Sequence, residues 1–171
     1  MDDLKGEHVK TVYAHFGLAI YASQVLEHGL ANAILVLDLV PRAASVATPE
    51  TWPDQVDSFY EGQFRKTLGQ LIGGMTKLTS VPSELEGHLA RALDRRNWLS
   101  HHYFRERAQD FLSERGRDKM IAELEEAQEL FYEADRALER VLKPIGERYG
   151  YTEAVFQREE QRMRKEAGDD I

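Results

Sequence analysis

Residues 96–103 read Arg-Asn-Trp-Leu-Ser-His-His-Tyr and concentrate polar chemistry inside an otherwise amphipathic helix. An arginine, an amide, two imidazoles and a phenol within about two helical turns can bind and cleave a phosphodiester without a metal. The apolar stripe of this helix places Arg96 where a core residue belongs, and a buried charge is costly unless it is paired. The position of Arg96 therefore needs either a structural or a chemical explanation.

The spacing within residues 96–103 constrains how these groups can cooperate. Asn97 and His101 are four residues apart, so the amide can orient the imidazole. Arg96 and His101 are about 140° apart on an ideal helix, which does not make them converge. Three arrangements would bring them together: the arginine side chain wraps around the helix, the helix kinks between them, or a second chain supplies part of the site.

Each of these residues also has an ordinary structural interpretation. Arg96 can pair with Glu27 or Gln24 at the edge of the first helix, and either His101 or His102 can be a solvent-facing histidine. Tyr103 on the apolar stripe fits a core aromatic residue with its hydroxyl at the rim. For each residue taken alone, the structural interpretation is stronger than the functional one. The occurrence of all of them within residues 96–103 favours a functional site.

The composition limits the class of protein. The 171 residues suffice for one domain, the absence of cysteine excludes disulfides and thiolate metal sites, and the net charge is −8. Residues 91–117 are the exception, with seven arginines against four acidic residues, whereas residues 118–171 hold nine basic and fifteen acidic ones. Arginine without lysine suits bidentate phosphate recognition, and an arginine-rich helix facing solvent is the alternative. The N-terminus has no signal-peptide pattern and the most apolar run is short, so we expect a soluble cytoplasmic protein without membrane contact.

Helical periodicity runs through the whole chain and predicts an all-α, up-down bundle of four to five helices. We expect one domain over residues 1–150, followed by a charged tail or peripheral helix over 151–171. The predicted helices span about 6–39, 54–74, 83–113 and 118–149, with a loop over 41–53.

Several residues predict where these helices begin and end. Pro41 follows the first helix, a capping box of Ser83 and Glu86 starts the third, Gly116 terminates it, and Pro144 kinks or ends the fourth. Glu27-His28 has no second histidine at metal-ligand spacing, and the adjacent His101 and His102 point about 100° apart, so no metal site is predicted and no cofactor is expected.

Arg96, His101 and Tyr103, with Asn97 directly after the arginine, resemble the R-x4-6-H signature of HEPN domains and the R-x4-H-x-Y form of the HepT-like toxin branch. The resemblance extends over roughly residues 5–148. It implies a HEPN-like helical bundle that forms a two-fold homodimer, with both signature segments lining the interface cleft.

The same resemblance implies a metal-independent endoribonuclease in a toxin–antitoxin or defence system. His101 would be the general acid or base, and Arg96 would hold the phosphate. Asn97 would position His101 or the phosphate. Tyr103 matches the position that a nucleotidyltransferase-type antitoxin modifies, and His102 and Arg95 would assist RNA binding. The alternatives are a non-catalytic HEPN-like module that binds a nucleotide, RNA or a protein, and a purely structural dimerisation bundle.

Overall fold

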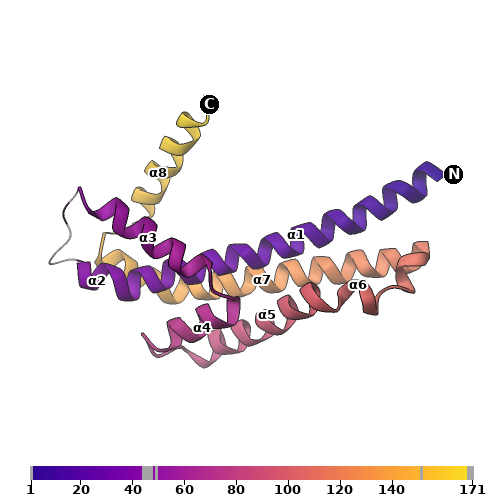
Figure 1. Ribbon diagram of the computed structural model, residues 1–171, viewed down its shortest axis with the longest axis horizontal. Coiled ribbons are helices and arrows are strands. Elements are labelled where there is room, and N and C mark those ends of the chain that lie inside the picture. Colours follow the sequence, from indigo (N-terminus) through magenta and orange to yellow (C-terminus); the bar gives the residue numbers. More distant parts are fainter. Residues whose placement is uncertain (1, 44–47, 49, 151, 169–171) are drawn as a thin grey trace.

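The structure is a computed structural model that describes residues 2–43, 48, 50–150 and 152–168. Over these residues the chain is all-α, as predicted (Figure 1). The first helix, α1 (Asp2–Ile34), continues through a π-helical turn, η1 (Leu35–Leu39), into the short α2 (Val40–Ala43). The remaining elements are α3 (Trp52–Phe64), α4 (Leu68–Thr76), α5 (Ser83–His101), α6 (Tyr103–Glu106), the 3-10 turn η2 (Asp110–Leu112), α7 (Glu114–Arg148) and α8 (Glu153–Glu166).

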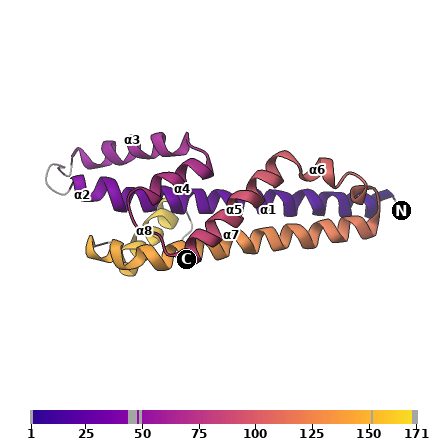
Figure 2. The same ribbon diagram turned by 90° about the horizontal axis from the view of Figure 1, so that it is seen from below.

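The two longest helices, α1 and α7, lie side by side along the molecule and run in the same direction (Figures 1 and 2). His8 contacts Asp118 near the start of both helices, at 3.0 Å. Further along, Gln128 donates to the carbonyl of His15. The expectation of antiparallel neighbours is therefore wrong for this pair.

Helix α5 packs against both long helices and runs antiparallel to them. Its first turn approaches the far end of α7, where Arg140 lies 4.0 Å from Glu84. The residue after its end, Tyr103, reaches Met120 near the start of α7. Residues 96–103 therefore lie beside the first half of α7 and beside the middle of α1.

One hydrophobic core fills the space between these helices. It includes the heptad-spaced residues of α7 that periodicity predicted: Leu124, Phe131 and Leu138 are each almost fully buried. Leu26 and Leu30 of α1 lie in the same cluster. The regular seven-residue step keeps one side of α7 facing its neighbours along most of its length.

The run from Gly6 to Ala43 is long and apolar enough to cross a membrane by length and composition alone. The core helix of a soluble protein passes the same test, and this run supplies much of the core described above.

The third predicted helix is interrupted, contrary to expectation. α5 ends at His101, and His102 adopts φ −128°, which separates α5 from the short α6. The apolar steps continue across this break, so periodicity did not reveal it. The change of direction places the Tyr103 ring in the core, where it meets Trp98 edge-on at 5.0 Å between ring centroids.

The second predicted helix is also two helices. The break follows Phe64, and Thr67 starts α4 with a capping box, in which its hydroxyl accepts from the Gln70 amide and the Gln70 side chain accepts from the Thr67 amide. The predicted capping box at Ser83 does not form, because Pro82 is the N-cap of α5 and makes no side-chain cap. The S/T-x-x-Q pattern was visible in the sequence at Thr67.

Two further expectations about helix ends, for Gly116 and Pro41, are wrong, and Pro144 does not end the fourth predicted helix. Gly116 lies in the first turn of α7, where a Cβ atom would come 2.0 Å from the carbonyl oxygen of Asp110. Glycine is therefore needed there for close approach, and not as a terminator. α7 continues past Pro144. Pro41 lies within α2, because the preceding π turn relieves the clash between a proline ring and the main chain four residues earlier.

After α7, Gly150 adopts φ +85° and the chain turns into α8. This helix projects away from the long helices (Figure 1). Most of its exposed residues are charged, and two arginines, Arg162 and Arg164, pair with glutamates one turn away. The expected loop over 41–53 includes residues 44–47 and 49, which lie outside the described residues.

Candidate functional site

The candidate residues gather at the C-terminal end of α5. Asn97, His101 and His102 are exposed to solvent, and Arg95 and Arg96 are partly buried. Asn97 lies one turn before His101 on a continuous stretch of helix, so the two share a face as predicted. The rings of His101 and His102 are 6.3 Å apart at 72°, because the helix ends between them.

Arg96 pairs with Glu27 of α1. Its Nε atom lies 3.5 Å from Glu27 Oε1, and the two side chains are 27% and 21% exposed. One of the two structural partners proposed for Arg96 is therefore confirmed. The pair is accessible from solvent, so the guanidinium is neither sealed in the core nor extended freely into water.

Within one chain, Arg96 and His101 leave α5 in different directions. α5 is continuous between them, five residues of regular helix place them about 140° apart, and Arg96 is directed to Glu27 of α1. Of the three arrangements that would join them in one site, a second copy of the chain is the one that keeps this geometry.

Tyr103 is buried, with only 1% of its surface exposed. Its hydroxyl donates to the main-chain carbonyl of Met120 at 3.1 Å, and burial raises the pKa of this phenol above its ordinary value. The hydroxyl therefore lies inside the core, and not at its rim. Modification of Tyr103 by a partner requires α6 to separate from α7.

Trp98, within residues 96–103, lines a shallow groove of about 470 Å³ between α5, α6 and α7. The guanidinium carbons of Arg95 and Arg107 lie 5.3 and 5.2 Å from its ring centroid, within range of a cation–π interaction. Its indole nitrogen donates to Glu106 at 2.8 Å.

Arg107 was not singled out in the sequence. It forms two hydrogen bonds with Glu123 of α7, at 2.6 and 2.8 Å, which fix its guanidinium and raise its pKa. The neighbouring Arg95 forms no ion pair with a described residue. The spacing of Arg95 and Trp98, three residues apart on a helix, was the available sequence signal.

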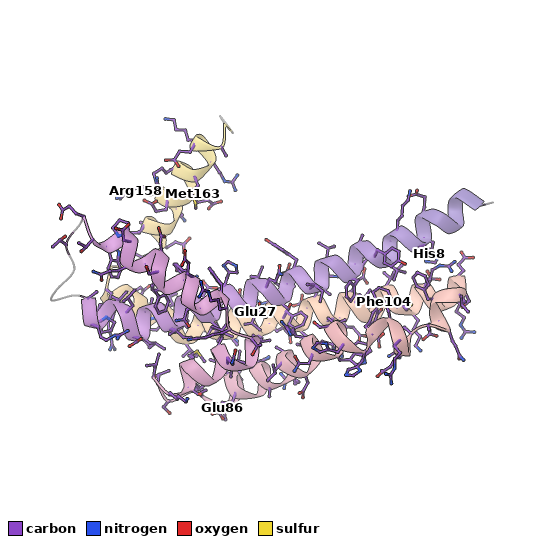
Figure 3. All side chains as sticks on the ribbon, in the orientation of Figure 1. His8, Glu27, Glu86, Phe104, Arg158 and Met163 are labelled. Atoms are coloured by element: carbon purple, nitrogen blue, oxygen red, sulfur yellow. The ribbon has the colours of Figure 1, made fainter. Side chains whose placement is uncertain are left out.

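An exposed aromatic surface lies next to the motif. Tyr13 and Phe104 are 52% and 37% exposed, with ring centroids 5.8 Å apart. Tyr13 and Glu27 are two heptads apart, so they lie on the same side of α1. Figure 3 places Phe104 between Glu27 and His8 along the long axis. The Tyr13–Phe104 pair and the Arg96–Glu27 pair therefore lie on the same side of α1, two heptads apart.

Within the described residues, no three histidine, aspartate or glutamate side chains lie close enough together to hold a metal ion. Comparisons with models of protein families, with curated proteins and with solved structures give no significant match to this chain.

Proposed function

We propose that this protein is a HEPN-like, metal-independent endoribonuclease that acts as a cytoplasmic homodimer. The observation that carries the proposal is the placement of Asn97 and His101 on one exposed face at the end of α5, while Glu27 of α1 holds Arg96 on another side of the same helix. In such a reaction the 2′-hydroxyl of RNA attacks the adjacent phosphorus and the P–O5′ bond breaks, which gives a 2′,3′-cyclic phosphate and a 5′-hydroxyl. His101 takes the proton of the 2′-hydroxyl or supplies one to the leaving 5′-oxygen, and Arg96 stabilises the charge that develops on the phosphate oxygens.

The proposed reaction requires the second copy of the chain. The face that carries Tyr13, Phe104 and the Arg96–Glu27 pair supports such pairing, because exposed aromatic surface beside polar groups is typical of interfaces. Across a two-fold axis, Arg96 of one protomer and His101 of the other would line one cleft. Arg95 and His102 would contact the RNA backbone on either side of the cleaved bond.

The regulation that the motif suggests belongs to the same proposal. A nucleotidyltransferase-type antitoxin would restrain this nuclease through Tyr103, in a toxin–antitoxin or defence context. Because the Tyr103 hydroxyl is buried, the antitoxin would act on a state in which α6 has separated from α7.

The first experiment measures cleavage of total RNA in EDTA by the purified protein, by Arg96→Ala and by His101→Ala. We expect cleavage that persists in the chelator and is lost in both variants. His88→Ala is the matched control, because His88 lies on α5 outside the motif. Equal cleavage by all four proteins, or none by the natural protein, contradicts the proposal.

The alternative is a non-catalytic HEPN-like module, and the Arg96–Glu27 pair is the observation that favours it. In that case Arg96 orders α5 against α1, and the face binds RNA, a nucleotide or a protein without cleavage. RNA binding without cleavage, with retained binding in His101→Ala, supports this alternative.

A further inference from the structure

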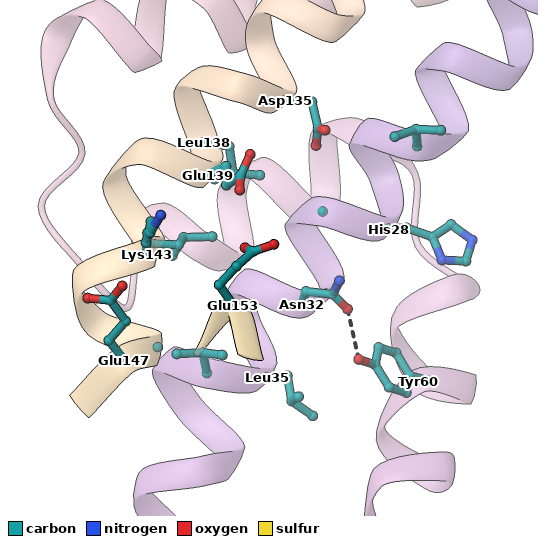
Figure 4. Close-up of a pocket in the computed structure, with 15 residues that line it drawn as sticks. His28, Asn32, Leu35, Tyr60, Asp135, Leu138, Glu139, Lys143, Glu147 and Glu153 are labelled. Carbon is teal, nitrogen blue, oxygen red and sulfur yellow. Dashed lines mark hydrogen bonds between the residues drawn. The ribbon is translucent and has the colours of Figure 1, made fainter. Parts of the chain in front are cut away.

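A cavity of about 440 Å³ opens between α1, α3, α7 and α8, and none of its lining residues belongs to the motif at 96–103 (Figure 4). Its size is within the range of small-molecule sites. Apolar side chains of α1, η1 and α7, among them Leu35, Val36, Leu138 and Leu142, form most of the lining. Leu35 and Val36 belong to the π turn, a distortion that often occurs at functional sites.

The polar groups of the cavity are mostly carboxylates. Asp135, Glu139, Glu147 and Glu153 line it together with a single lysine, Lys143, so its formal charge is negative. None of these five groups forms an ion pair with a described residue. The neighbouring cations of α7, Arg136 and Arg140, pair instead with Glu129 and Glu84. The cavity therefore carries a net negative charge, which Lys143 and the nearby Arg136 offset only in part.

Asp135 is the most confined of the four carboxylates. Its Oδ1 atom packs against Gly29 of α1, where a Cβ atom would come within 2.6 Å. Burial raises the pKa of this carboxyl, and the charge of Glu139 raises it further. A cation placed at Asp135 would relieve this cost.

The opposite wall is held by an ordered aromatic pair. Tyr60 of α3 donates to Asn32 of α1 at 2.8 Å and stacks on Phe64 at 5.5 Å between ring centroids (Figure 4). His28 packs against Phe64 at 4.5 Å. These contacts attach α3 to α1 along one wall of the cavity.

We propose that this cavity binds a small organic cation, with its ammonium group at Asp135 and Glu139 and its apolar body against Leu138 and Leu142. An anion of the same shape is excluded by the carboxylates, and a neutral molecule gains only the apolar contact. The site is separate from the proposed nuclease face.

Three probes that share one apolar body test the proposal: 4-phenylbutylamine, 4-phenylbutanol and 4-phenylbutanoate. Isothermal titration should show one amine bound per chain, at least about tenfold tighter than the alcohol, since a charge-assisted hydrogen bond contributes about 1.5–3 kcal/mol. The carboxylate should not bind. Amide chemical shifts should change for residues of the cavity, Gly29 and Gly146 among them.

Variants then locate the ammonium group. Asp135→Asn should weaken amine binding at least about tenfold and leave alcohol binding unchanged, because the shape is kept and only the charge is lost. Glu139→Gln, at the exposed rim, should weaken it less. Glu126→Gln is the control, an exposed carboxylate of α7 outside the cavity. Equal binding of the three probes, no binding of the amine, or equal losses in Asp135→Asn and Glu126→Gln would overturn the proposal.

Discussion

Replacing Glu27 by glutamine separates the two roles that Arg96 can have. The substitution keeps the shape of the side chain and removes the charge that now lies 3.5 Å from the guanidinium. The raw attraction between unit charges at this distance is about 5 kcal/mol with an effective dielectric constant of about 20. Desolvation and side-chain entropy offset most of it, and pairs of this exposure contribute about 0.5–1 kcal/mol to stability.

The expected loss in Glu27→Gln is therefore about 1 kcal/mol in the free energy of unfolding, or a fall of about 2–4 °C in Tm for a chain of this length. RNA affinity should change in the opposite direction. Without Glu27, the guanidinium becomes available to a phosphate, so binding of a non-cleaved RNA to a Glu27→Gln, His101→Ala double variant should exceed that of His101→Ala alone.

Urea unfolding measures the first quantity, and fluorescence anisotropy with a labelled RNA measures the second. Glu86→Gln is the control, because Glu86 is an exposed carboxylate at the start of α5 that forms no ion pair with a described residue. If Glu27→Gln lowers stability and leaves RNA affinity unchanged or weaker, Arg96 is a structural residue and the phosphate-binding role is wrong.

Three other predictions concern a buried hydrogen bond, a close main-chain approach and a buried carboxyl. Tyr103→Phe should lower the free energy of unfolding by about 1 kcal/mol in urea titrations, because it removes one buried hydrogen bond to the main chain of α7; an unchanged midpoint would place the hydroxyl in solvent. Gly116→Ala should lower the free energy of unfolding by at least about 2 kcal/mol, because the new Cβ atom meets main-chain atoms of Asp110. Its control, Gly62→Ala, lies in open space on α3 and should raise the free energy of unfolding by up to about 1 kcal/mol. Equal effects of the two substitutions would refute the close approach at Gly116. Burial raises the pKa of Asp135 in the folded state, so stability should fall as pH rises from the ordinary aspartate range through the raised value; Asp135→Asn should remove this fall, and identical pH profiles would contradict it.

The sequence predicted the helical class and much of the core, because heptad spacing such as that of Leu124, Phe131 and Leu138 depends only on local periodicity. It did not predict that α1 and α7 are parallel. Their relative direction depends on how many times the chain reverses between them, and this number follows from the helix breaks that periodicity missed. The break at His102 was also missed. It arises from a tertiary contact, the burial of Tyr103 against α7, which local patterns do not contain.

For the candidate site, the sequence predicted that Asn97 and His101 share a face and that Glu27 is one of two partners open to Arg96. The cavity lined by Asp135 could not be foreseen, because its residues come from four separate helices. Burial of the Tyr103 hydroxyl likewise follows from a contact seventeen residues away.

The central claim is that Arg96 of one protomer and His101 of its partner act on the same phosphodiester. Mixing Arg96→Ala with His101→Ala tests it directly, since each variant alone is inactive in both protomers. After unfolding and joint refolding, half of the dimers should be mixed, and each should regain one of two sites, so RNA cleavage in EDTA should return to about one quarter of the natural level. No recovery in a verified mixed dimer would contradict the claim.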